Sequence, residues 1–357
     1  MKKNKLVLIL IIILALIALV LFLTQSKSTF KKALSDFAVD DTATITKFFL
    51  ADKNNNSVKL TRAEPGKWLV NDKYVAHNQG INLLLKTMFE LEVKQPVAAP
   101  ARDNTIKELA VSSVKVEIYQ IRFRINIFDK LKWFPYEKLT KVYYVGGAIP
   151  SNLGSYMLME NSTVPFVTFL PGFRGFVSPR YTPMEKNWRD FSVFRKSIPE
   201  IASVRMEFPS DPGNSYEVKK EGEQQFSLFT IPDNRLVLNT DTLKILNFLS
   251  GFRSLNFEAL LNDMDPIRKD SIVKSTPFLI ITLTDINGQR KTVKTFHKAN
   301  LGGQADFEGK PLPYDPDRLY ALVNDEQDFT LIQFFVFDKV LRPKFYFLKE
   351  QLPKAKK

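Results

Sequence analysis

The sequence predicts an α+β protein: an N-terminal transmembrane helix followed by two tandem similar domains, each a mainly antiparallel sheet with a packed helix. Three observations support this fold class: an unbroken apolar run at the start, two stretches with strand-like alternation, and one helical period within each stretch. The expected parts are residues 1–24 (signal anchor), 25–44 (juxtamembrane linker), 45–183 (first repeat), 184–200 (basic linker), 201–340 (second repeat) and 341–357 (basic tail).

The apolar run from Leu6 to Leu23 contains only Leu, Ile, Val, Ala and one Phe. As a helix it would be about 27 Å long, close to the roughly 30 Å of bilayer hydrocarbon. Because most cleaved signal peptides have a shorter apolar part, we expect a retained anchor. Cleavage near Thr24 and Ser26 is the alternative. A lipid anchor is excluded, because the chain has no cysteine to acylate.

The bulk of the chain is expected outside the cytoplasm. Three lysines precede the apolar run and Lys27, Lys31 and Lys32 follow it, so the charge bias that orients membrane helices is nearly balanced. A signal-like start normally sends the long following part across the membrane. Absence of cysteine suits an oxidising compartment and excludes disulfides. The sequence therefore predicts a single-pass protein of the cytoplasmic membrane, with residues 33–357 on the periplasmic side.

The first repeat combines short strands with one amphipathic helix. Ile81, Leu84, Met88 and Leu91 follow the helical period, and Asn78 is a candidate N-cap. A shorter helix is expected at residues 106–110, and strands at residues 45–50, 58–61, 68–70, 114–119, 122–128, 142–145, 156–159 and 164–170.

The second repeat shows the same order of elements. Ile245, Phe248 and Phe252 repeat the helical period, with Asn239 or Thr240 as a cap. Strands are expected at residues 201–208, 215–219, 226–231, 277–284, 292–297, 319–323 and 329–336, with a hairpin turn at residues 285–288.

Counterparts in the two repeats lie about 160 residues apart. The offset grows from 156 between Ile45 and Ile201 to 164 between Tyr156 and Tyr320. A duplication followed by small insertions would produce such a drift. Each repeat is also the size of one domain with its own core. We therefore interpret the two halves as a tandem repeat.

The formal charge of +13 is concentrated in the middle of the chain. Residues 118–197 hold twelve basic and five acidic side chains, together with seventeen of the forty-four aromatic residues. Two basic clusters stand out: Arg122, Arg124, Lys130, Lys132, Lys138 and Lys141, and then Arg174, Arg180, Lys186, Arg189, Arg195 and Lys196.

Two interpretations of this basic, aromatic segment compete. In one, the aromatic residues are core and the cations form a solvated face. In the other, the segment binds an anionic lipid or glycan or an acidic partner, and Arg174, Arg180, Arg189 and Arg195 are the candidate surface. Arg189 could instead be structural, by pairing with Asp190 or stacking on a tryptophan. Nucleic acid is not expected as a ligand at an extracytoplasmic site.

No residue constellation in the sequence identifies a reaction. His77 and His297 lack neighbouring ligands, so we expect no metal, no cofactor and no catalytic residue. Residues 285–288 begin like a calcium loop but lack the downstream acidic ligand. Two carboxylate pairs, residues 263 and 265 and residues 315 and 317, stand beside proline, where turn and cap chemistry is ordinary.

Several short strings together resemble a known family. They include Gly66-Lys67-Trp68-Leu69-Val70-Asn71, Leu91-Glu92-Val93-Lys94-Gln95-Pro96-Val97, Val145-Gly146-Gly147, Gly154-Ser155-Tyr156-Met157, Pro171-Gly172-Phe173-Arg174-Gly175, Arg180-Tyr181 and Trp188-Arg189-Asp190. Over roughly residues 44–340 the chain resembles the domain of unknown function numbered forty-three forty, found in membrane-anchored proteins of Bacteroidota. Relatives fused to auxiliary components of ABC-type transport and gliding systems imply an accessory role. No site residues are carried over from the family.

The expected function is a membrane-anchored binding or assembly module, accessory to an envelope complex, which the family resemblance links to transport. The rival hypothesis is an envelope enzyme that acts on glycan or lipid with a carboxylate pair as acid and base. Two facing carboxylates in a pocket would favour the enzyme. A shallow basic and aromatic face would favour the module.

Overall fold

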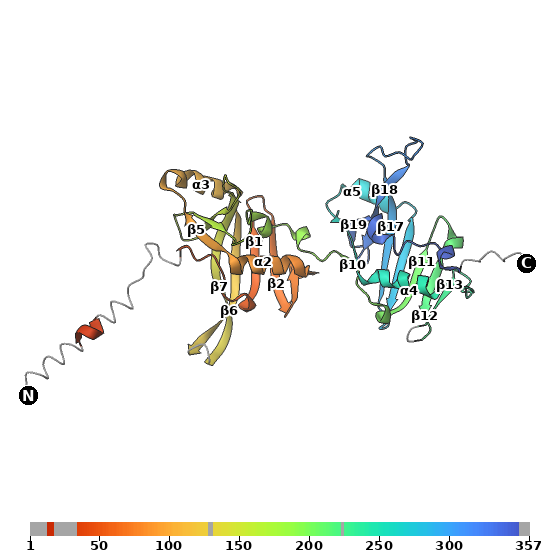
Figure 1. Cartoon of the computed structure of the whole chain (residues 1–357), viewed down its shortest axis with the longest axis horizontal. Coiled ribbons are helices and arrows are strands. Elements are labelled where there is room, and N and C mark those ends of the chain that lie inside the picture. The colour runs from red at the N-terminus through yellow and green to blue at the C-terminus, as the bar shows by residue number, and fades with distance from the viewer. Residues whose placement is uncertain (1–12, 18–33, 128–130, 223–224, 350–357) are drawn as a thin grey trace, which may run out of the picture. The chain divides into compact units, whose positions relative to one another are not determined.

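The computed structural model describes residues 13–17, 34–127, 131–222 and 225–349, and the chain divides into two compact units, Met1–Asp190 and Phe191–Lys357. The α+β class is confirmed, because every pairing between described strands is antiparallel and helices are few (Figure 1). The predicted membrane helix lies largely outside the described residues, and only residues 13–17 of it are seen, as helix. Within the described part, no helix is long and apolar enough to cross a membrane.

The first unit is built on a nine-stranded sheet of order β4-β3-β2-β1-β6-β7-β8-β9-β5. Its elements are β1 Ile45–Ala51, β2 Ser57–Glu64, β3 Lys67–Val70, β4 Tyr74–Val75, α2 Asn78–Glu90, β5 Glu92–Pro96, α3 Ala99–Ser112, β6 Val114–Ile127, β7 Leu131–Ala148, β8 Ser155–Met159 and β9 Phe166–Phe169.

Helix α2 covers one face of this sheet because its apolar stripe matches the helical period. Ile81, Leu84 and Met88 are buried in one cluster with Phe48 and other inward residues of the strands. The cap is His77 rather than the expected Asn78: its Nδ1 accepts the backbone N–H of Gly80 at 3.0 Å. Helix α3 is longer than the helix predicted at residues 106–110.

The second unit is built on an eight-stranded sheet of order β13-β12-β11-β16-β17-β18-β19-β15. Its elements are β10 Ser192–Phe194, β11 Ile201–Glu207, β12 Tyr216–Lys220, β13 Phe226–Thr230, α4 Thr242–Ser250, β14 Leu255–Asn256, β15 Ala259–Leu260, α5 Pro266–Val273, β16 Leu279–Asp285, β17 Arg290–Ala299, β18 Tyr314–Val323, β19 Asp328–Gln333 and α6 Phe334–Phe337.

Helix α4 anchors an aromatic core in the second unit. Asp241, not Asn239 or Thr240, caps it by accepting the backbone N–H groups of residues 243 and 244. The Phe248 ring lies 5.3 Å from the rings of both Phe252 and Phe347, in edge-to-face arrangements that aromatic pairs favour. The hairpin predicted around residues 285–288 is confirmed as the β16–β17 turn.

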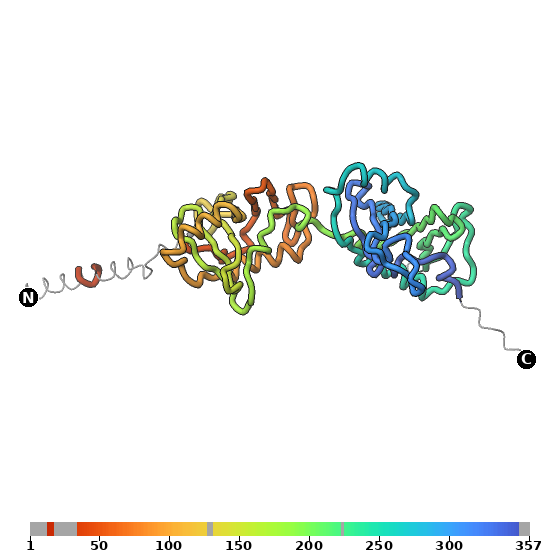
Figure 2. Tube along the Cα trace, turned by 90° about the horizontal axis from the view of Figure 1, so that it is seen from above, coloured from red at the N-terminus to blue at the C-terminus, as the bar shows by residue number. Residues whose placement is uncertain are grey.

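The chain passes once from the first unit to the second, as the colour order in Figure 2 shows. The predicted linker, residues 184–200, is not a bare connection. Trp188 is buried in the core of the first unit, and Val193 and Phe194 are buried in that of the second. Both ends of this segment are therefore fixed by packing.

Candidate functional site

Strands β6 and β7 extend well beyond the sheet that holds them. The last pair between β6 and β1 is Gln120 with Ile45, and β7 pairs with β8 only from Tyr143 onward. Residues 121–127 therefore pair only with residues 131–137. We call residues 121–127 and 131–139 the arm. Figure 1 shows it projecting from the edge of the first unit.

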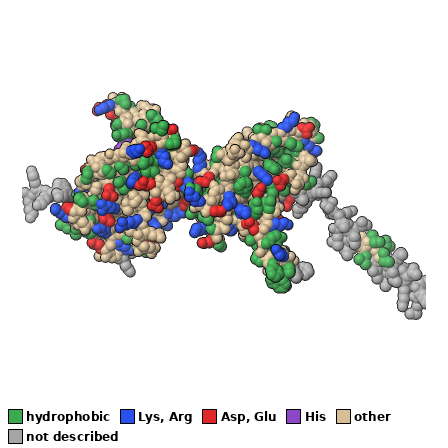
Figure 3. Space-filling model, turned by 180° about the vertical axis from the view of Figure 1, so that it is seen from behind, with side chains coloured by type: hydrophobic (Ala, Val, Ile, Leu, Met, Phe, Trp, Pro, Cys, Tyr) green, Lys and Arg blue, Asp and Glu red, His purple; other side chains and the backbone are tan. Residues whose placement is uncertain are grey.

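The arm exposes large apolar side chains instead of burying them. Every described residue from 131 to 139 is exposed, including Trp133 at 51% and Phe134 at 65% of the maximum. Figure 3 shows hydrophobic side chains gathered on this projection. Phe134 also has a φ of +58°, which is unusual for a bulky residue and, like other local strain, is typical of functional segments.

The two faces of the arm differ in chemistry. Directly paired residues point to the same face of a ladder, and successive residues alternate between faces. The pairs Phe123–Pro135 and Ile125–Trp133 make one face apolar. On the other face the cations lie in the pairs Arg122–Tyr136, Gln120–Lys138 and Asn126–Lys132. The arm is thus an amphipathic hairpin with no core to cover its apolar face.

Gln120 holds the base of the arm. It is almost fully buried, and its Nε2 donates to the Thr44 hydroxyl at 2.7 Å while its Oε1 accepts from the Thr140 hydroxyl at 2.7 Å. On the apolar face, Glu137 accepts from the Thr46 hydroxyl and the Lys47 ammonium, both at 2.6 Å. Despite partial burial, which alone would raise it, these two bonds hold the pKa of Glu137 below its usual value.

The segment that leads into the first unit is tied to the same base. The Lys141 Nζ lies 2.7 Å from both the carbonyl and the carboxylate of Asp36. A cavity of about 420 Å³ lies alongside, with three carboxylates and three cations in its wall. These charged residues are Asp36, Asp40, Asp41, Arg122, Lys132 and Lys141. Because the signs balance, the cavity is not an anion site.

The four arginines chosen from the sequence do not form one surface in the first unit. Arg174 is exposed, but Arg180 is half-buried: it donates to the Thr87 hydroxyl at 2.9 Å, and its guanidinium lies 4.4 Å from the Phe173 ring. Arg195 is exposed and belongs to the second unit. Only Arg174 and Arg195 are therefore presented to solvent.

Arg189 is a structural residue. It is only 6% exposed, its guanidinium lies 3.4 Å from the centre of the Tyr74 ring, and it pairs with Glu185 at 3.8 Å. The stacking partner is Tyr74 rather than the neighbouring Trp188. A buried, stacked guanidinium cannot meet a ligand at the surface, so Arg189 is corrected from a binding candidate to a packing residue.

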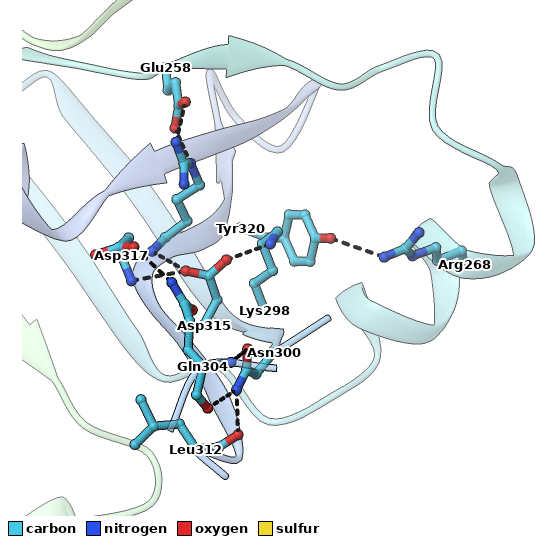
Figure 4. Close-up of polar contacts among 10 residues, drawn as sticks. Glu258, Arg268, Lys298, Asn300, Gln304, Leu312, Asp315, Asp317 and Tyr320 are labelled. Carbon is cyan, nitrogen blue, oxygen red and sulfur yellow. Dashed lines mark hydrogen bonds and ion pairs between the residues drawn. The ribbon is translucent and has the colours of Figure 1, made fainter. Parts of the chain in front are cut away.

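The carboxylate pair at residues 315 and 317 serves the chain itself, as Figure 4 shows. Asp315 Oδ1 accepts the backbone N–H groups of Asp317 and Arg318, and its Oδ2 pairs with Lys298 at 2.5 Å. Burial would raise its pKa, but the Lys298 ammonium and the two amides lower it instead. Asp315 therefore stays ionised near neutral pH and is unsuited to donate a proton.

The surrounding polar contacts are also structural. Arg318 makes a bidentate pair with Glu258 at 2.8 and 3.0 Å, which lowers the pKa of that carboxyl (Figure 4). In the other predicted pair, Asp265 caps α5 by accepting the backbone N–H of Arg268 at 2.9 Å, and Asp263 lies in the turn before it. Neither pair places two carboxylates face to face over a described pocket.

Both histidines make structural contacts. The Nδ1 of His77 accepts a backbone N–H, so its Nε2 carries the proton and donates to the Asn187 carbonyl at 2.9 Å. His297 stacks on Tyr314 with ring centres 4.1 Å apart, and burial lowers its pKa. Among the described residues, no group of three or more His, Cys, Asp and Glu side chains could hold a metal ion.

Comparisons with known proteins give no further guide. No family model, no curated protein and no solved structure matches the chain. The resemblance stated from the sequence strings therefore stays a proposal, and the site has to be argued from its own geometry.

The sequence predicts the first basic cluster, which lies on and beside the arm, but it predicts no strand at residues 131–141. A signal is present: residues 121–127 alternate strictly between Ile or Phe and Arg or Asn. That alternation predicts an amphipathic strand, and ordinarily its apolar side packs on a core. Only the structure shows that this strand runs past the core.

Proposed function

We propose that this protein is a membrane-anchored, extracytoplasmic binding or assembly module that works through the arm. The observation that carries the proposal is an amphipathic hairpin, residues 121–127 and 131–139, which exposes Ile125, Leu131, Trp133 and Phe134. A two-stranded hairpin is only marginally stable in water without something packed against it. Exposed clusters of large apolar residues mark interaction sites in soluble domains.

The enzyme hypothesis gains no support from the site. Of its candidate acids, Asp265 caps α5, and Asp315 accepts backbone N–H groups of the following turn. The Lys298 ammonium holds Asp315 ionised. A carboxylate pair that acts as acid and base needs one protonated and one ionised group facing the same substrate. The proposed role in an envelope complex, and kinship with the family that the sequence resembles, are consistent with an accessory binding module.

We also propose that the two units arose by tandem duplication. Reading along the two sheets, β1, β2, β3, β6, β7, β8, β9 and β5 correspond to β11, β12, β13, β16, β17, β18, β19 and β15. Corresponding registers agree in detail: Tyr156 pairs with Val167, and Tyr320 pairs with Leu331, both 164 residues later. An experimental structure in which residues 45–170 do not superpose on 201–336 would contradict this origin.

The location can be tested with single cysteines, because the chain has none of its own. Cysteine at Asn55 or at Asn287, both exposed turn positions, should react with a membrane-impermeant maleimide in intact spheroplasts. Reaction only after lysis would place the bulk of the chain in the cytoplasm.

The role of the arm can be tested by photo-crosslinking in intact cells. A benzophenone amino acid at Leu139, on the arm, should form an adduct with a lipid or protein that mass spectrometry identifies. The matched control is the same amino acid at Phe307, a fully exposed position of the second unit. Equal yields at the two positions, or none at Leu139, would overturn the proposed function.

A further inference from the structure

We propose that the ligand of the arm is the surface of an anionic phospholipid bilayer, into which the arm inserts its exposed aromatic residues at the level of the headgroups. This inference rests on the proposed function and names its binding partner. Four features of the described residues carry it: the aromatic content of the arm, its charge, its position relative to the predicted anchor, and the kind of cation it presents.

The side chains near the end of the arm are those that favour a membrane interface. Trp133 and Tyr136 combine an apolar ring with a polar atom, and Phe134, Leu131 and Ile125 are purely apolar. All five are at least 38% exposed. Tryptophan and tyrosine are enriched at headgroup depth, where one end of the ring meets hydrocarbon and the other meets water.

The charge of the arm suits an anionic surface. The arm contains four basic side chains and one acidic side chain, Glu137, which is already paired with Lys47 at the base. Arg122 and Lys138 lie on the face opposite Phe123 and Trp133, which they share with Tyr136, and the Lys132 ammonium lies 5.8 Å from the centre of the Phe123 ring. An arm lying with its apolar face in the headgroups would keep these cations at the surface, where anionic lipids attract them.

The arm is also within reach of the membrane that would hold the anchor. Asp36 is fixed to the arm base by Lys141, and only twelve residues, 24–35, separate it from Leu23, the end of the predicted span. Extended, that segment covers at most roughly 45 Å. Beyond Gln120 the arm itself extends by roughly 23 Å, given about 3.3 Å per residue. The unit could therefore rest its arm on the bilayer that it is tethered to.

The composition favours lipid over a protein partner. The cores of protein interfaces are depleted in lysine, whereas lysine with a long aliphatic stem is common beside membranes, where the stem lies along apolar surface and the ammonium reaches the headgroups. Lys132 and Lys138 are both exposed and lie among the aromatic residues of the same strand. A second copy of the chain or an envelope protein is the competing occupant that the experiment must exclude.

The three tryptophans make the test selective. Trp68 and Trp188 are 2% and 3% exposed in the core of the first unit, whereas Trp133 is 51% exposed on the arm. Full-length protein is reconstituted into vesicles of phosphatidylcholine with phosphatidylglycerol that carry brominated acyl chains. Trp133 should lose emission by roughly twofold, because an indole at headgroup depth lies within reach of the bromines. Trp133→Phe should abolish the quenching and leave the emission of the two buried tryptophans unchanged.

Charge variants establish the requirement for anionic lipid. The double variant Arg122→Glu with Lys132→Glu should remove most of the quenching, and so should the use of phosphatidylcholine vesicles alone. Salt at about 1 M should have the same effect, because it reduces the Debye length to about 3 Å. Arg235→Glu, an exposed cation of the second unit, is the matched control and should change nothing. Equal quenching in neutral and anionic vesicles would overturn the proposed charge recognition.

Two further outcomes separate the lipid proposal from the broader function. Trp133 could be shielded from aqueous acrylamide without being quenched by brominated lipid; a protein would then occupy the arm, and the lipid proposal fails while the binding function stands. Trp133 fully open to acrylamide in every vesicle and in intact cells would overturn both.

Discussion

The hairpins β6–β7 and β16–β17 occupy corresponding places in the strand orders of their sheets, yet only one of them leaves the sheet. Strand β6 has 14 residues and β16 has 7, and β7 has 18 where β17 has 10. Strand β6 pairs with β1 and strand β16 with β11, and both pairings show a register shift, near Ile45 and Ile201. The difference between them is an extension added at a turn.

One pair of residues shows how each hairpin ends or continues. Gln120 pairs with Ile45, and Asp285 pairs with Ile201. The Asp285 carboxylate accepts the backbone N–H groups of Asn287 and Gln289 and pairs with Lys196 at 2.8 Å, and these bonds lower its pKa. A carboxylate that collects backbone donors closes the turn. The neutral amide of Gln120 instead bonds the hydroxyl groups of Thr44 and Thr140, and the β6–β7 ladder continues beyond it.

This difference shows where a sheet can be extended by a projecting hairpin such as the arm. Loops and turns tolerate insertion because their backbone is already at the surface, whereas a change within the ladder would displace the core. In the first unit the residues of the arm form their own ladder, so their backbone groups are paired without help from the sheet. If the proposed duplication is correct, the second unit is an internal reference for the first unit without its arm.

The largest expected effect tests whether the two hairpins belong to units that unfold separately. Phe248→Ala removes a ring that packs against Phe252 and Phe347, and should cost the second unit about 3–5 kcal/mol. All three tryptophans lie in the first unit, so tryptophan fluorescence follows only that unit. Calorimetry should show that the unfolding transition of the second unit moves to a lower temperature. The transition followed by tryptophan fluorescence, which reports the first unit, should not move. Phe335→Ala, at an exposed position, is the control.

The next effect probes the core beneath the arm. Burial raises the pKa of Tyr181 to about 12 and that of Tyr143, on β7, well above its ordinary value. The folded state thus keeps its protons when the unfolded state loses them. Stability is complete below about pH 10 and should fall as the pH rises towards 12, by roughly 2–3 kcal/mol for Tyr181. Urea unfolding followed by tryptophan fluorescence measures it, and Tyr181→Phe should flatten the profile.

A smaller effect is expected from converting one hairpin into the other. Replacing residues 121–138 by Ile-Asn-Gly-Gln, the turn of the second unit, should change the free energy of unfolding by no more than about 1 kcal/mol, since surface changes outside the core cost little. Urea unfolding followed by Trp68 and Trp188 measures it. Failure of the first unit to fold would show that the arm is part of its structure rather than an addition.

The smallest effect concerns the contact that fixes the arm to the sheet. Glu137→Gln removes the ion pair with Lys47, which is partly exposed, so the cost should be about 0.5 kcal/mol and less at high salt. Chemical denaturation at two salt concentrations measures both the loss of unfolding free energy and its dependence on salt. Lys274→Ala, which breaks a more exposed pair with Asp270, should cost less still. A salt-independent loss would indicate that packing, not charge, holds the arm base.

The sequence determined those features that depend on local periodicity. The helices around Ile81 and Ile245, the hairpin at residues 285–288 and the antiparallel α+β class follow from apolar spacing and turn residues that act within a few positions. Even here the caps differed by one or two residues, because a histidine or an aspartate can satisfy the same backbone donors as the expected asparagine.

Only the tertiary structure decided which apolar and charged residues are exposed. Ile125 and Ile118 lie on one strand and look alike in sequence, yet Ile118 is buried in the core of the first unit and Ile125 lies on the arm. Arg189 looks as free as Arg174 until Tyr74, 115 residues earlier, is brought against it. Burial depends on which distant segments pack together. The alternation of apolar and polar residues along a strand does not indicate where the neighbouring strand ends, so it cannot predict which residues of that strand are exposed.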